Sequence, residues 1–149
     1  MKVQEEICYD DDTISINKLI PLEEQQFKYI LCIVLKTEIA NEKIFNKMNN
    51  YFIQCFNGEF FNLYIDFSNI TSVGPIVLKN QIQKIKEFSS NPKSGCKRCC
   101  LVLGEKLAKI TGSKTFEKII KKSCGDCIVD TFYDKKEAYN LVKTPVPEN

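Results

Sequence analysis

The spacing of hydrophobic residues changes several times along the chain, and each change marks a predicted element. Residues 28–35 are apolar at nearly every position, which is typical of a central strand covered on both faces. Over residues 41–56 the apolar side chains recur at helical spacing, and the stretch ends at Asn57 and Gly58, a good helix stop signal. Residues 60–67 return to strand spacing. This first half therefore predicts strand, helix and strand.

The second half of the chain continues the alternation. The predicted elements are a helix that begins at Pro75, a strand at 99–103, helical segments at 105–110 and 116–122, a strand at 127–132 and a last helix capped by Asp134. Strands that alternate with helices predict a largely parallel sheet with helices packed on it. Residues 13–20 predict a further strand, either half-exposed or at an edge of the sheet, that ends at Pro21, so antiparallel pairing is expected only near the N-terminus.

The predicted fold is α/β, with a mixed, mostly parallel sheet of five or six strands and about four helices. A length of 149 residues suits a single domain, with a core at about 13–143 and a loose tail at 144–149. No apolar run approaches the ~20 residues of a membrane helix, and the N-terminus lacks the apolar stretch of a secretory signal. We therefore expect a soluble protein of the reducing cytoplasm.

Two absences narrow the chemistry. The chain has no histidine, which excludes histidine-dependent triads, nucleophiles and metal sites. No paired carboxylates suggest acid–base catalysis either, so we do not expect an enzyme. Arg98 is the single arginine among 21 basic residues. Because arginine supplies most two-pronged contacts to bases and phosphates, specific nucleic-acid recognition is not expected.

The charges are unevenly distributed although the net charge is only +2. Residues 1–24 carry seven acidic and two basic side chains, and residues 93–122 carry nine basic and two acidic ones. The lysine-rich 93–122 segment could attract an anionic partner or make a peripheral contact with a membrane surface. The same pattern is also that of a solvated, lysine-rich surface that the acidic segment balances.

The order of elements and three short segments resemble the STAS domain, the fold of bacterial anti-sigma-factor antagonists and of the cytoplasmic ends of sulfate transporters. Residues 63–70 (LYIDFSNI) are similar to the family strand that ends in Asp-Leu-Ser-x-Val. Residues 101–104 resemble the next strand and its turn, and residues 129–138 resemble the last strand and final helix. The resemblance covers residues 13–143 and rests on order and spacing together.

This resemblance implies a non-enzymatic, regulatory module that binds a protein partner. In phospho-regulated STAS domains the loop after that strand reads Asp-Ser-Ser-Gly, and its second serine accepts phosphate. Here residues 74–77 read Gly-Pro-Ile-Val, and the acceptor serine is missing. Thr71 and Ser72 lie nearby, either as substitute acceptors or as turn and capping residues, but a constitutive binder is expected. The expected contact residues are Ser68, Asn69, Thr71, Ser72, Val73, Gly74, Ile76 and Lys79.

Cysteines supply a second candidate site. Cys96 with Cys99, and Cys124 with Cys127, form two C-x2-C pairs. Each pair precedes a predicted strand, so neighbouring strands would bring all four sulfurs to one edge of the sheet, where they could enclose zinc. Ordinary reduced thiols explain the same pattern without a cofactor. Redox activity is not expected, because neither pair begins a helix.

The sequence thus leaves three hypotheses for function. The first is the STAS-like binding module that acts through residues 68–79. The second is a structural or adaptor protein stapled by zinc at the cysteine cluster. The third is a small-ligand or lipid binder, which ranks last because a large cavity is difficult to build within one domain of this length.

Overall fold

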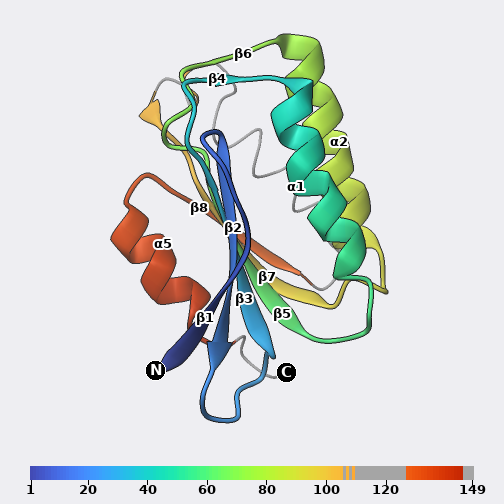
Figure 1. The fold of residues 1–149 in the computed structure, drawn as a ribbon, viewed down its shortest axis with the longest axis vertical. Helices are drawn as coiled ribbons and strands as arrows, with labels where there is room; N and C mark the ends of the chain where they lie inside the picture. Colours follow the sequence, from blue (N-terminus) through green and yellow to red (C-terminus); the bar gives the residue numbers. More distant parts are fainter. Residues whose placement is uncertain (106, 108, 110–126, 146–149) are drawn as a thin grey trace.

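The computed structural model describes residues 1–105, 107, 109 and 127–145, with the backbone alone at 82, 86, 89 and 90. Its centre is a six-stranded sheet with the order β1-β2-β3-β5-β7-β8 (Figure 1). The strands are β1 (Val3–Asp10), β2 (Ile14–Pro21), β3 (Tyr29–Leu35), β5 (Phe61–Asp66), β7 (Cys96–Val102) and β8 (Ile128–Phe132). The first three pair antiparallel, and β3, β5, β7 and β8 pair parallel. The predicted mixed, mostly parallel sheet is confirmed.

Helices cover both faces of the sheet (Figure 1). Helices α1 (Glu42–Gln54) and α2 (Pro75–Ser90) pack on one face, and α5 (Lys135–Val142) packs on the other. The side chains of β3 and β5 therefore point alternately into two separate cores, which explains why β3 is apolar on both faces. On the side of α5, β5 carries Tyr64 and the buried polar residues Asn62 and Asp66. None of the described helices is long and apolar enough to cross a membrane.

Local capping sets the helix starts where the sequence predicts them. The Asn41 side chain accepts a hydrogen bond from the Ile44 amide at 3.0 Å, and the Asp134 side chain accepts one from the Lys136 amide at 2.9 Å. Pro75 is the first residue of α2. The predicted segment 116–122 lies outside the described residues, as do residues 106, 108 and 110 of the segment 105–110.

Strand β1 extends the sheet beyond the predicted core range of 13–143. It pairs with β2 along nearly its whole length, and the register shifts between Ile7 and Tyr9. Most of its side chains are exposed or half-buried, including Glu5 and Glu6. This strand was hard to predict because a strand at the edge of a sheet needs little hydrophobic surface.

Strand β7 begins at Cys96, three residues before the predicted start at residue 99. The ladder between β5 and β7 shifts register at this end, where Phe61 pairs with Cys96 but Asn62 pairs with Arg98. The extra residue, Lys97, reverses the alternation, so Cys96 and Cys99 both lie in the core beneath α1 and α2. The first C-x2-C pair is therefore inside the strand and not before it.

The C-terminal part of α5 is held to the middle of the sheet by buried polar groups. The Asn62 amide donates a hydrogen bond to the carbonyl oxygen of Val142 at 2.8 Å. Arg98, which is 5% exposed, lies 3.6 Å from the carboxylate of Asp130 and donates to the carbonyl oxygen of Pro145 at 3.4 Å. One residue of the predicted tail thus makes a contact with the sheet, while residues 146–149 lie outside the described residues.

Candidate functional site

The 68–79 surface lies at the end of the molecule where β5 finishes and α2 begins. Two short parallel strands, β4 (Ile39–Ala40) and β6 (Ser72–Val73), pair there, and each leads directly into a helix (Figure 1). The pairing holds the N-termini of α1 and α2 side by side. The predicted loop is therefore an ordered platform.

Hydrogen bonds attach this platform to the ends of the central strands. The amides of Thr71 and Ser72 donate to the carbonyl oxygen of Glu38, at 2.8 and 3.1 Å. The side-chain amide of Asn69 donates to the carbonyl oxygen of Leu35 at 3.0 Å. Because backbone and side-chain groups are both engaged, the exposed residues of this loop are presented in a defined arrangement.

The predicted contact residues differ in exposure. Asn69, Ser72, Gly74, Ile76 and Lys79 are exposed, whereas Ser68, Thr71 and Val73 are half-buried. Ile76 is the most prominent, because 75% of this large apolar residue is exposed in the first turn of α2.

Ile39 adds a second exposed apolar side chain to the same end of the molecule. It is 66% exposed and pairs with Ser72 in the small sheet. Sequence reasoning missed Ile39, because its place beside the loop depends on the pairing of β4 with β6. A single isoleucine in the polar stretch Thr37-Glu38-Ile39 was the only available signal.

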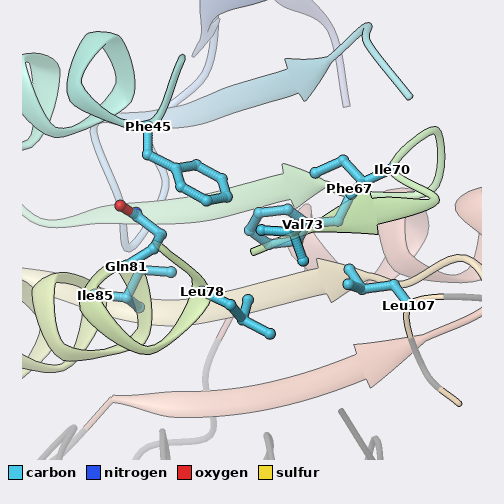
Figure 2. A pocket seen from close by; sticks show the side chains of 8 residues that line it. All are labelled: Phe45, Phe67, Ile70, Val73, Leu78, Gln81, Ile85 and Leu107. Atoms are coloured by element: carbon cyan, nitrogen blue, oxygen red, sulfur yellow. The ribbon is translucent and has the colours of Figure 1, made fainter. Parts of the chain in front are cut away.

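Val73 points into the protein. Its side chain lines a narrow apolar pocket between the helices and the loop (Figure 2). The lining residues are Phe45, Phe67, Ile70, Val73, Leu78, Gln81, Ile85 and Leu107. The cavity volume is about 10 Å³, roughly the room that one water molecule needs. In this conformation the pocket does not accommodate a lipid chain, and Val73 serves packing.

The hydroxyl residues of the loop are only partly available. The Ser68 hydroxyl is buried, and the backbone amide of Ser68 donates a hydrogen bond to the carboxylate of Asp66 at 2.8 Å. The Thr71 hydroxyl lies 3.5 Å from the carbonyl oxygen of Glu38. Gly74 occupies the cap position of α2, so neither Thr71 nor Ser72 caps this helix. Ser72 is the most exposed hydroxyl of the loop.

The cysteine cluster is brought together in part. The sulfur atoms of Cys96 and Cys127 lie 3.7 Å apart, with the Cys127 thiol as donor. Cys99 is fully buried in the same core, and Cys124 lies outside the described residues. Within the part of the chain that the structure describes, no three metal-ligating side chains form a group. One cysteine of each C-x2-C pair thus meets one of the other, and zinc binding stays a prediction.

The described part of the lysine-rich 93–122 segment has fewer free charges than its composition suggests. The Lys97 ammonium lies 4.3 Å from the ring centre of Phe60, and the Arg98 guanidinium is buried beside Asp130. Lys93 and Lys109 are exposed. Two of these four cations are therefore engaged within the fold.

Comparison with known proteins identifies the fold. No protein-family model and no curated protein matches the chain. Among solved structures, it is similar to an uncharacterized protein of the DUF3478 family from Shewanella loihica PV-4, which has a SpoIIAA-like fold. The TM-score is 0.56 at 13% identity, and the match covers 92% of this chain and 99% of the other. The chain thus has a SpoIIAA-like fold, which is the fold of STAS domains and the one expected from the resemblance.

Proposed function

We propose that this chain is a regulatory, non-enzymatic binding module that contacts a protein partner through residues 68–79, extended by Ile39. The observation that carries the proposal is the exposure of Ile76, 75%, on an ordered platform at the start of α2. A large apolar side chain at such a position gains ~1.5–3 kcal/mol when it is fully buried. Ile76 is therefore the expected anchor of the interface.

The groups around Ile76 define the chemistry of the partner. Ile39 supplies a second apolar contact. The exposed residues Glu38 and Glu42 lie near Ile39 in the chain and Lys79 lies one turn after Ile76, so they add charges of both signs. This composition matches a protein interface with an apolar centre and a polar rim. The half-buried loop residues, Ser68, Thr71 and Val73, support the surface from below.

The test compares one substitution on the surface with a matched one elsewhere. Ile76→Lys places a charge at the proposed anchor, and Ile53→Lys makes the same change at a residue that is 65% exposed near the other end of α1. Each of the three chains is cross-linked to the proteins that bind it. The candidate partners are the proteins that the wild-type chain and Ile53→Lys capture and that Ile76→Lys does not.

Each candidate partner is then purified and titrated against the three chains. We expect Ile76→Lys to weaken binding by tenfold or more, which is about 1.4 kcal/mol, and Ile53→Lys to leave the affinity unchanged. Ile39→Lys is expected to weaken the same complex. A partner that binds folded Ile76→Lys as tightly as the wild type would refute this surface as the interface.

A further inference from the structure

Cys96 and Cys127 form a close pair that the proposed binding function does not use. Cys96 is the first residue of β7, and Cys127 directly precedes β8, the neighbouring parallel strand. Their sulfur atoms are 3.7 Å apart, close to van der Waals contact. The two residues come from different C-x2-C motifs, so this proximity is a product of the strand pairing.

The pair differs from the other cysteines of β7 in its position. Cys96 and Cys127 are 9% and 8% exposed, whereas Cys99 and Cys100 are completely buried further along the strand. Burial also raises the pKa of Cys100 to about 12, which keeps that group in the unreactive thiol form. A small oxidant can therefore approach the pair at the end of the sheet more easily than the cysteines behind it.

We propose that Cys96 and Cys127 are a site of reversible disulfide formation, with a small disulfide such as oxidised glutathione as the oxidant. One thiol loses its proton, and the thiolate attacks the small disulfide, forming a mixed disulfide and releasing one molecule of the reduced small thiol. The second protein thiol then loses its proton and displaces the other small thiol. The protein loses two electrons and two protons, and two small thiols carry them away.

The distance between the two sulfur atoms sets how far they must move to form this bond. A disulfide has a sulfur–sulfur length of about 2.05 Å, so the two atoms need to approach by roughly 1.7 Å more. Rotation of the two side chains about their Cα–Cβ bonds would have to supply a shift of that size. The bond would join the first residue of β7 to the residue before β8 and close a loop that contains residues 97–126.

The site is remote from the proposed binding surface. The parallel strands all begin at the same end of the sheet, and Cys96 is the first residue of β7. Residues 68–79 follow the last residue of β5 and thus lie at the opposite end of the parallel strands. Oxidation is expected to change the stability of the fold and to leave partner binding through Ile76 unaltered. The disulfide proposal and the proposed binding function can therefore fail independently of each other.

The experiment maps the bond after exposure of the full chain to oxidised glutathione. Free thiols are alkylated, and trypsin, which cleaves after Lys93 and Lys97, leaves Cys96 alone in a four-residue peptide. Cys124 and Cys127 share a second peptide, so an additional cleavage before Asp126 separates them. We expect a Cys96–Cys127 cross-link that reduction with dithiothreitol removes.

Three variants serve as controls. Cys96→Ser and Cys127→Ser should lose the cross-link, while Cys32→Ser, at a residue of equal burial that is 9% exposed, should keep it. Oxidation should raise the unfolding temperature of the wild type by about 5 °C or more, and not that of Cys96→Ser.

Three results would overturn the proposal. The first is that all of Cys96 can still be alkylated after exposure to the oxidant, which means that it formed no disulfide. The second is a disulfide between Cys96 and Cys124 instead. The third is stoichiometric zinc in the purified protein that both Cys96→Ser and Cys127→Ser remove, since this outcome assigns the two sulfurs to a metal.

Discussion

Asn49 of α1 and Gln81 of α2 bond to each other through both of their side-chain amides. The Asn49 nitrogen donates to the Gln81 oxygen at 3.0 Å, and the Gln81 nitrogen donates to the Asn49 oxygen at 3.1 Å. Gln81 is 3% exposed and also lines the pocket beside Val73. The pair fixes the register of the two helices that carry the proposed binding platform.

The Asn49–Gln81 pair should show strong coupling in a double-mutant cycle. Gln81→Met or Asn49→Leu alone leaves a partly buried amide without its partner, which costs about 1–3 kcal/mol. The double variant removes both polar groups, so we expect it to be more stable than the sum of the single effects predicts. Urea unfolding of the four proteins measures the coupling, and additive single effects would contradict it.

Val73 and Ile76 should respond differently to the same substitution. Val73→Lys places an ammonium group among the apolar side chains of the pocket, so we expect it to lower the free energy of unfolding by about 1–3 kcal/mol. Ile76→Lys changes an exposed side chain and should stay within about 0.5 kcal/mol of the wild type. Denaturant titration separates the two, and an equal loss of stability in both would mean that Ile76 is a packing residue.

Asp11 should make the stability of the fold sensitive to acid. Its carboxylate accepts hydrogen bonds from the Lys47 ammonium and the Tyr9 hydroxyl, both at 2.6 Å, and from the Thr13 hydroxyl at 2.7 Å. These donors, Lys47 foremost, hold the pKa of Asp11 well below its usual range.

A carboxyl group whose pKa is lower in the folded state stabilises the fold above its unfolded pKa of about 3.9, and this contribution disappears as the pH falls through the folded pKa. We therefore expect Asp11→Asn to be less stable than the wild type at pH 7, and the difference to shrink as the pH falls below 4. Thermal unfolding across this range measures it. Asp12→Asn, at the exposed neighbouring residue, is the control and should change the stability less, both at pH 7 and below pH 4.

Gly95 should tolerate no side chain. Its φ angle is +65°, and an added Cβ would overlap with the carbonyl oxygen of Glu59. Gly58 has a similar φ of +79°, but a Cβ there would meet nothing within 4 Å. Gly58→Ala therefore measures the backbone strain alone, about 1 kcal/mol, and Gly95→Ala should cost clearly more. Equal unfolding free energies for the two variants would show that the Glu59 backbone moves aside.

The sequence predicts the parts of this fold that depend on local pattern. The strand around Leu31, the helix capped by Asn41 and the helix that begins at Pro75 are found where spacing and capping residues place them. In each case one short window contains the whole signal, because periodicity and caps act over a few residues.

The sequence does not predict features that depend on contacts between distant segments. The early start of β7 follows from a register shift against β5, and the inward direction of Val73 follows from the pairing of β6 with β4. The proximity of Cys96 and Cys127 was expected from strand order, but the position of Cys99 behind them results from the irregular residue Lys97. The candidate surface was predicted as a segment, and only the structure shows which of its side chains point outward.

Strand β1 has a consequence for how copies of this protein meet. Its outer side is one of the two edges of the sheet in the described residues, where unpaired amide and carbonyl groups are able to pair with a strand of another copy. Glu5 and Glu6 stand exposed along this margin, and the register shift after Ile7 interrupts its straight run. A second copy that docked its own β1 here would bring carboxylates close to carboxylates, so this repulsion opposes the pairing of two copies through β1 at neutral pH.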